Sequence, residues 1–213
     1  SWWKAENNAY DAIGSHDGTM QNGATFAAGK VGQAFSFDGT DDYVRIASPF
    51  TGFTTAITVE YWINASSFQV GAGLGQGTEN TDSMAGNVWL MHGNTDGSLS
   101  WLVNDSGTWR QTDTAGASIL GGWHHVAGVS DSLGTKLYVD GVLVGTPGSG
   151  ISSGIQANAS AVIHLGKDVR YSSARFVTGL LDEPTIYNRA LDATEIQAIY
   201  DAGSVGKRLE LDF

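Results

Sequence analysis

The sequence of 213 residues contains no cysteine, only three prolines and only eleven Lys and Arg. Without cysteine the protein has no disulfide, no thiolate metal site and no thiol nucleophile. Eleven basic residues against 22 Asp and Glu give a formal charge of −11, which argues against the clustered cations of a nucleic-acid-binding face. No apolar run approaches the roughly 20 residues that span a membrane as a helix, so we expect no membrane insertion.

The start of the chain also lacks the basic and apolar regions of a signal peptide. We therefore expect a domain that is part of a longer protein. A length of 213 residues suits one large β-sandwich, and a hydrophobic fraction of 41% supplies enough apolar surface for a folded core. The acidic residues offer carboxylates for calcium, or they merely keep the protein soluble.

Short apolar or alternating stretches recur between clusters of Gly, Asn, Asp and Ser, which predicts roughly ten or more β-strands. Two of these stretches flank Asp140-Gly141, a pair that favours a type I′ hairpin turn. Pro184 lies inside a predicted strand at 178–187, so we expect that strand at a sheet edge or bulged at this point. The pattern predicts an all-β protein, a two-sheet antiparallel β-sandwich.

One helix interrupts the strand pattern near the end of the chain. Asp192 and Glu195 have the spacing of a capping box, and Gly203 suits the left-handed position just after a helix. The sequence therefore predicts one short helix near residues 193–202, with Ile196 on the face that docks on the sandwich.

Two long stretches, 71–87 and 148–160, are polar and rich in glycine. Loops of this length inside a compact domain are usually functional or mobile. Gly71-Ala72-Gly73-Leu74-Gly75 superficially resembles a dinucleotide-binding loop, but no helix follows it to receive a phosphate. We interpret it as a flexible loop.

The order and spacing of several motifs resemble a known family. The motifs are Phe37-Asp38-Gly39, Asp42-Tyr43-Val44, Trp123-His124-His125-Val126-Ala127 and Gly179-Leu180-Leu181-Asp182-Glu183. The chain resembles the laminin-G-like, concanavalin A-like jelly-roll domains of bacterial extracellular proteins. The resemblance implies a jelly-roll domain over residues 1–206, a tail or linker at 207–213, and a secreted or cell-surface location. Jelly rolls of this kind serve as lectins, adhesion modules, protein-binding domains and glycoside hydrolases, so the site must decide the function.

The resemblance also implies a structural calcium ion between the N-terminal segment and the late strand. On this basis we expect Asp38 and Asp182 as ligands, followed by Glu6 and Asp17. The alternative is that these carboxylates cap turns through their own backbone, as Asp beside Gly commonly does.

A carbohydrate site needs an aromatic face for the sugar ring and amides or charged groups for its hydroxyls. Trp101 alternates with apolar residues and is expected in the core, whereas Trp109 has no apolar neighbours and is the better exposed candidate. Arg170 and Tyr171 form an alternative patch before the late strand. The candidate ligand-binding residues are His92, Asn104, Trp109, Arg110, Arg170 and Tyr171.

Catalysis has little support, because the Glu-x-Asp-x-x-Glu strand of glucanases with a related fold is absent from the sequence. The leading hypothesis is a non-catalytic module, a monomer, that binds carbohydrate or a cell-surface glycan and carries a structural calcium. Neighbouring domains of a larger protein are further expected partners. The alternatives are a protein–protein adhesion or structural module without a sugar site and, with less support, a glycoside hydrolase or lyase domain.

Overall fold

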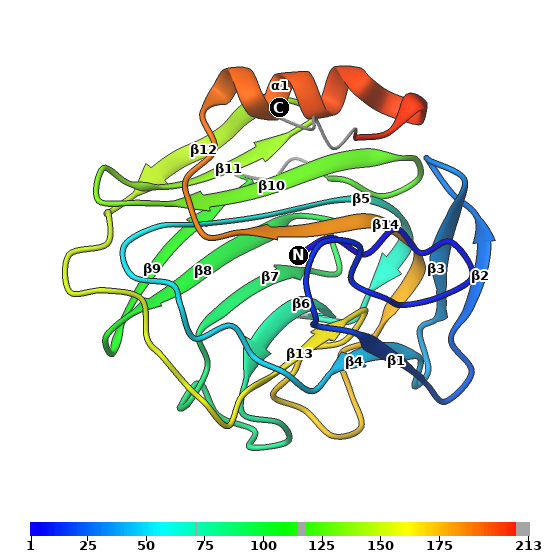
Figure 1. Ribbon diagram of the computed structural model, residues 1–213, viewed down its shortest axis with the longest axis horizontal. Helices are drawn as coiled ribbons and strands as arrows, with labels where there is room; N and C mark the ends of the chain where they lie inside the picture. The colour runs from blue at the N-terminus through cyan, green and yellow to red at the C-terminus, as the bar shows by residue number, and fades with distance from the viewer. Residues whose placement is uncertain (71, 115–117, 208–213) are drawn as a thin grey trace.

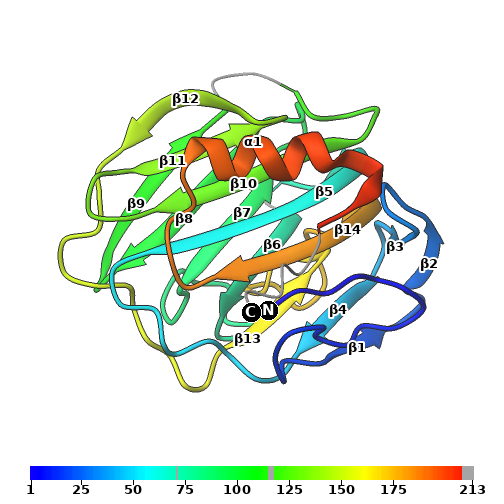
Figure 2. The same cartoon turned by 45° about the horizontal axis from the view of Figure 1, so that its top comes forward.

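The computed structural model describes residues 1–70, 72–114 and 118–207. Within these residues, fourteen strands form two sheets of seven, and all pairs of these strands are antiparallel (Figure 1). The sheet that we name the front sheet lies behind the other one in Figure 2. It runs in the order β1 (Gly18–Gln21), β4 (Tyr43–Ile46), β13 (Val162–Leu165), β6 (Ala72–Gly77), β7 (Trp89–Gly93), β8 (Leu99–Asp105), β9 (Thr108–Asp113). The back sheet runs in the order β12 (Val142–Gly148), β11 (Thr135–Val139), β10 (His124–Ser130), β5 (Ile57–Phe68), β14 (Val177–Tyr187), β3 (Gln33–Asp38), β2 (Thr25–Ala28).

The hydrophobic core lies between the two sheets. Alternate residues of the strands point inward, and Trp3, Phe35, Trp89 and Trp101 are fully buried there. The prediction that Trp101 belongs to the core is thereby confirmed. The two-sheet sandwich predicted from the period-2 pattern is confirmed as well.

The glycine-rich stretch at 72–77 is a strand, not the flexible loop expected from the sequence; Gly71 itself lies outside the described residues. Strand β6 lies inside the front sheet, between β13 and β7. A Cβ at Gly73 would lie 2.1 Å from the carbonyl oxygen of Met91, and one at Gly75 would lie 2.5 Å from a methyl group of Leu90. Glycine is therefore required here for close approach of neighbouring chain segments.

Strand β14 crosses the interior of the back sheet, between β5 and β3. Its pairing with β5 shifts register between Asp182 and Thr185, and Glu183 has a φ of 57°. The bulge expected at Pro184 is present, but the alternative of an edge strand is wrong. The Pro184 carbonyl accepts a hydrogen bond of 3.0 Å from the Trp3 N–H, which ties the N-terminal segment to this point.

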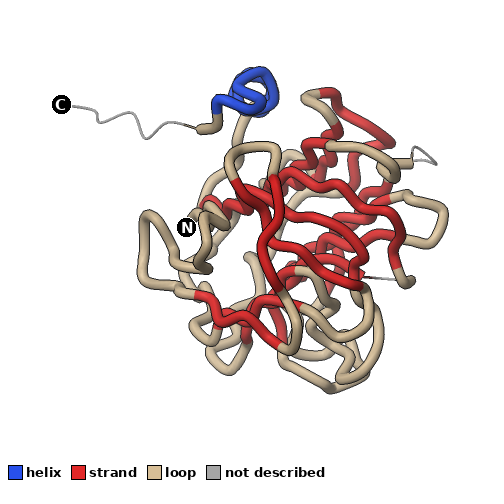
Figure 3. Tube along the Cα trace, turned by 90° about the vertical axis from the view of Figure 1, so that its right-hand side faces the viewer, coloured by secondary structure: helices blue, strands red, loops and turns tan. Residues whose placement is uncertain are grey.

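Helix α1 (Ala193–Ala202) begins with the predicted capping box and ends at Gly203, which has a φ of 50°. A short 3-10 helix, η1 (Gly203–Val205), follows it. The helix packs Ile196 against Ala127, Val129 and Tyr138 on the outer face of the back sheet (Figures 2 and 3). In the described residues, this helix is too short and too polar to cross a membrane. The predicted hairpin at Asp140-Gly141 is present, with φ values of 52° and 79°.

Candidate functional site

The outer face of the front sheet carries three rows of side chains, which follow from the strand register. Trp109 pairs with Asn104 in the first row, and Gln111 pairs with Leu102 in the second. The third row contains Asp113, Ser100 and His92. These residues alternate with the core residues of the same strands, so they point away from the sandwich interior.

The middle of this face is covered by an apolar mound. Leu90, Leu102 and Val162 project from the sheet, and Val169 and Met84 from two loops pack on them; Trp109 packs against the edge of this group. The mound separates the Trp109 end of the face from the His92 end. The described part of this face therefore has no continuous trough of polar side chains across its centre.

A cavity of about 600 Å³ opens beside Trp109, at the first row. It lies where the loop before β7, the turn between β8 and β9, and the loop before β13 meet. Its volume is in the range of small-ligand sites. The cavity is lined by Thr78, Met84, Ala85, Gly86, Asn104, Gly107, Trp109, Gln156, Ala157 and Asn158.

Hydrogen bonds between distant segments hold the cavity open in one shape. Asn158 Nδ2 donates to Thr78 Oγ1 at 3.0 Å and to the Gly86 carbonyl at 2.5 Å, so it ties the two long loops together. The Gln156 N–H donates to the Asn104 carbonyl at 2.8 Å, which fixes the second loop to β8. Side chains held this way need little further ordering on binding, which favours affinity.

Polar groups of the cavity are free to meet a ligand. Trp109 is half-buried, and its Nε1 has no hydrogen-bond partner among the described residues. Gln156 uses Nε2 on the Ala157 carbonyl at 2.9 Å and leaves Oε1 unbonded within the described chain. Asn104 shapes the site instead, because its Oδ1 accepts from the Gly107 N–H at 2.6 Å and its Nδ2 donates to the Asn87 carbonyl at 3.0 Å. The site thus offers an aromatic surface, the Gln156 oxygen as an acceptor and, as donors, the Trp109 N–H and the hydroxyl of Thr78, which only accepts within the described chain.

Arg110, expected beside Trp109, lies on the opposite face of β9. Adjacent residues of a strand point to opposite faces, and Arg110 pairs across with Val103, a core residue. Its guanidinium binds Asp105 at 2.6 Å and Ser152 Oγ at 2.9 Å. The structure does not bring Arg110 to the cavity; it fixes the loop behind the cavity.

His92, Arg170 and Tyr171 gather at the other end of the face, beyond the mound. The Arg170 guanidinium makes a close ion pair of 2.6 Å with Asp168 and is 7% exposed. Arg175 stacks on the Tyr171 ring at 3.8 Å. Burial, with Arg170 nearby, lowers the pKa of His92 to about 4. In this second polar patch the two arginines are already paired, with Asp168 and Tyr171, whereas the buried Nδ1 of His92 has no hydrogen-bond partner among the described residues.

Two of the four expected calcium ligands meet at the loop between β2 and β3. Asp182 is fully buried; its Oδ2 accepts from the Val31 N–H at 2.8 Å, and its Oδ1 has no partner. Burial raises the pKa of Asp182 to about 6. Glu6 lies against the same loop, where its Oε1 accepts from the Gln33 N–H at 3.2 Å. A buried carboxylate oxygen without a partner, with a second carboxylate nearby, fits a hard cation.

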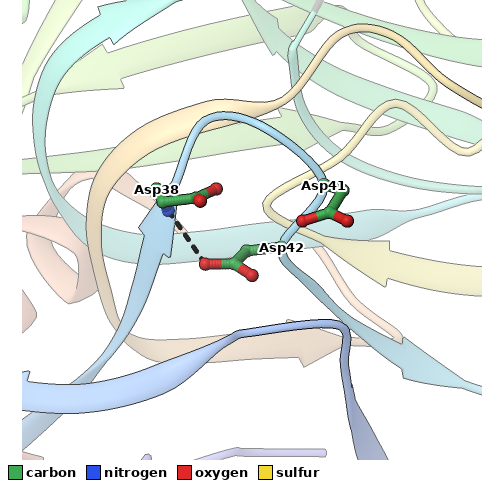
Figure 4. A group of neighbouring side chains, drawn as sticks. All are labelled: Asp38, Asp41 and Asp42. Atoms are coloured by element: carbon green, nitrogen blue, oxygen red, sulfur yellow. Dashed lines mark hydrogen bonds between the residues drawn. The ribbon is translucent and has the colours of Figure 1, made fainter.

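Asp38 and Asp17 lie elsewhere. Asp38 pairs with Thr178, four positions along β14 from Asp182, which separates them by roughly 13 Å at strand spacing, too far for one ion. Figure 4 shows Asp38 beside Asp41 and Asp42, where Asp42 accepts from the Asp38 N–H at 3.0 Å. Asp17 accepts from the Asp11 N–H at 2.9 Å. Asp38 caps its own turn by accepting from the Thr40 N–H at 2.7 Å, which is the behaviour that the alternative describes, whereas Asp17 binds the backbone of a residue six positions earlier.

A third polar group, the Lys207 cluster, is buried on the outer face of the back sheet. Lys207 Nζ lies 2.7 Å from Glu60 Oε1 and 4.0 Å from Glu183 Oε2, and His125 Nε2 lies 3.1 Å from Glu60. Burial opposes ionisation of Glu60, but Lys207 and His125 outweigh it and lower the pKa of Glu60 to about 2. Lys207, expected in a tail, thus packs on the domain; residues 208–213 of that tail lie outside the described residues.

Residues 38–197 match the family model described as the Concanavalin A-like lectin/glucanases superfamily. The chain belongs to this family. The fold is also similar to domain 4 of AbnA, a GH43 extracellular arabinanase from Geobacillus stearothermophilus, solved in complex with arabinotriose. That likeness has a TM-score of 0.72 at 20% identity and covers 93% of this chain and 96% of that one.

The fold is also similar to parts of larger proteins. The chain matches the binding domain of Paraclostridial Mosquitocidal Protein 1 at 16% identity and a TM-score of 0.62, over 93% of this chain and 52% of that one. It matches a Trypanosoma rangeli sialidase at 16% identity and a TM-score of 0.68, over 94% of this chain and 32% of that one. No curated protein matches the sequence. The family thus spans lectins and glucanases, and these likenesses establish the fold alone.

Proposed function

We propose that this chain is a non-catalytic carbohydrate-binding module that holds a sugar in the Trp109 cavity. The observation that carries the proposal is a half-buried tryptophan with a free N–H, set among amide side chains in a preformed cavity of about 600 Å³. Sugar rings stack their C–H faces on aromatic rings and exchange hydrogen bonds with amides. Support also comes from the AbnA domain of the same fold, which was solved with arabinotriose.

A hydrolase function has no support from the cavity. Glycoside hydrolysis needs two carboxylates on either side of the scissile bond. The residues that line the cavity include no Asp or Glu. Glu60 and Glu183 lie near each other, but they are buried at the Lys207 cluster, away from the cavity and shielded from substrate.

A glycan array probed with the protein, followed by calorimetric titration of the strongest binders, tests the proposal. We expect binding to at least one class of oligosaccharide and a loss of roughly tenfold or more in affinity for Trp109→Ala, because the stacking surface is removed. Trp123→Ala is the matched control, a partly buried tryptophan remote from the cavity lining. Failure to bind any glycan, with retained binding to a protein partner or neighbouring domain, would favour the adhesion or structural alternative.

The proposed module also binds one calcium ion, held by Asp182 and Glu6 at the loop between β2 and β3. The buried, unpartnered Oδ1 of Asp182 supports this placement. The ion would neutralise two carboxylates and join the N-terminal segment to β14, so its role would be structural. Calorimetric titration of calcium into chelator-treated protein tests it, with one site as the expected result.

We place the module in an extracellular protein, secreted or at the cell surface, where it would attach neighbouring domains to a glycan. Support comes from the AbnA domain, which belongs to an extracellular enzyme. The larger proteins of similar fold, of which this chain spans about half or a third, support a role as one part of a longer chain. Fractionation of the native source with antibody against this domain would test the location.

A further inference from the structure

We infer that the Trp109 cavity selects uncharged sugar units and rejects sugars that carry a carboxylate. This inference rests on the proposed function and names the ligand class of the same site. It follows from the chemistry of the lining, the pairing of nearby cations and the charge of the whole chain.

The lining contains no charged side chain among the described residues: amides, one hydroxyl, one indole and small or apolar groups surround the space. The hydroxyls of a sugar can accept from Trp109 Nε1 and donate to Gln156 Oε1, because each hydroxyl is both donor and acceptor. A carboxylate can only accept. It would use the indole N–H and face the Gln156 oxygen without a donor between them.

The cations nearest to the cavity in the chain are occupied elsewhere. Arg110 follows Trp109 but points to the other face of β9, where it is bound to Asp105 at 2.6 Å. Arg170 contacts the lining residue Met84, with Nη1 2.6 Å from Sδ, but its guanidinium is already ion-paired with Asp168 at 2.6 Å. A carboxylate entering the cavity would therefore lose water without gaining a counter-charge, and this desolvation is unfavourable.

The charge of the chain acts in the same direction. A formal charge of −11 repels anionic ligands at long range, although salt screens this effect within about 10 Å at 0.1 M. The contact effect inside the cavity is screened much less. If the preference for neutral over anionic sugars persists at high salt, it arises from the cavity lining. If the preference disappears at high salt, it arises from the net charge of the chain alone.

The test compares one neutral oligosaccharide, the strongest binder on the array, with the same molecule oxidised at its primary hydroxyl groups to carboxylates. Both are titrated calorimetrically at 0.15 M and 0.5 M NaCl. We expect the oxidised form to bind roughly tenfold or more weakly at both salt concentrations. Equal or tighter binding of the oxidised form, lost in Trp109→Ala, would overturn the inference and leave the proposed function standing.

A pair of variants separates the lining from the net charge. Gln156→Arg places a cation in the cavity, whereas Gln111→Arg adds the same charge on an exposed part of the same sheet face, outside the lining. We expect the ratio of the affinities for the neutral and the oxidised ligand to fall severalfold in Gln156→Arg and to change little in Gln111→Arg. An equal fall in both variants would contradict selection by the lining. Absence of binding by every neutral and oxidised glycan would overturn the proposed function, and the inference with it.

Discussion

The Trp109 cavity and the Lys207 cluster differ in exposure to solvent, in charge and in how their polar groups are bonded. The cavity is open to solvent, has no charged lining and leaves Trp109 Nε1 unbonded. The Lys207 cluster is closed and charged, with Glu60 fully buried against Lys207 and His125. Free groups are useful where a ligand can satisfy them, whereas a buried charge must be paired within the protein.

The comparison implies that recognition and stability can be changed separately. Substitutions at the Lys207 cluster should alter the free energy of unfolding and leave sugar affinity unchanged. Substitution of a cavity group without a partner in the protein, such as Gln156 Oε1, should instead alter mainly the sugar affinity. The two regions lie on outer faces of different sheets, with the core between them, and distant sites usually contribute independently.

The largest effect is expected for Lys207→Met. The change removes the main counter-charge of a fully buried carboxylate, which typically costs about 3 to 5 kcal/mol. Urea unfolding should show this loss of stability, and sugar affinity at 25 °C should not change. In the double variant Glu60→Gln/Lys207→Met no unpaired charge remains, so most of the loss should be recovered. If Lys207→Met and the double variant had the same free energy of unfolding, the unpaired Glu60 carboxylate would not be the cause of the loss.

The next largest effect is expected from calcium. It tests whether the buried carboxylate of Asp182 is paired with a cation, as Glu60 is in the Lys207 cluster. An ion that binds only the folded protein stabilises it by about 2.7 kcal/mol at a hundredfold excess over its Kd. Thermal unfolding with calcium and with chelator should differ by several degrees. Asp182→Asn should abolish this difference, while Asp38→Asn should retain it, because Asp38 lies apart from Asp182. If calcium changed the melting temperature of both variants equally, Asp182 would not be a calcium ligand.

A smaller effect is expected at Asn158, which holds the two long loops together. Asn158→Ala loses two donated hydrogen bonds and the one that Oδ1 accepts from the Ser160 N–H, each worth about 1 kcal/mol of stability. The sugar affinity should fall severalfold, because the cavity must then be ordered on binding. Ser160→Ala is the control, since Ser160 contributes only its backbone N–H to Asn158. If Asn158→Ala bound the sugar as tightly as the unmodified protein, the hydrogen bonds of Asn158 would not be needed to order the two loops.

Local sequence patterns predicted most of the fold. Period-2 alternation predicted the sandwich, Asp140-Gly141 predicted its hairpin, and Asp192 with Glu195 predicted the start of α1. Strand β6 was missed because glycine is depleted from strands, and its presence here depends on neighbours such as Met91, which are distant in sequence. Tertiary packing, rather than local preference, makes that segment a strand.

The candidate site was only partly predictable. The polar sequence around Trp109 suggested an exposed ring, but the ring is half-buried and packs against the apolar cluster that contains Leu90 and Leu102. The two long loops contain the residues that complete its cavity. Gln156 and Asn158 were missed, because the loop sequence gave no sign of which side chains turn inward. Arg110 could have been excluded by strand alternation, whereas the separation of Asp38 from Asp182 depends on strand register, which the sequence does not specify.

The smallest expected effect is that of pH on sugar binding. No titratable side chain lines the cavity in the described chain, and His92, beyond the mound, has a pKa lowered to about 4 by burial and Arg170, so it stays neutral above pH 5. Sugar affinity should therefore change less than about twofold between pH 5 and 8. Calorimetric titration across this range measures it.

Below pH 4.5, stability should instead respond to pH through Glu60 of the Lys207 cluster. The pKa of Glu60 is about 2 in the folded protein, against a usual 4.5, despite its burial, because Lys207 and His125 favour the carboxylate. As the pH falls below 4.5, the unfolded chain takes up a proton that the folded chain does not, so this stabilisation is present above pH 4.5 and is lost towards pH 2. Glu60→Gln should flatten that part of the urea-unfolding profile. A sugar affinity that instead followed an ionisation between pH 5 and 8 would place a titratable group in the site and contradict its neutral character.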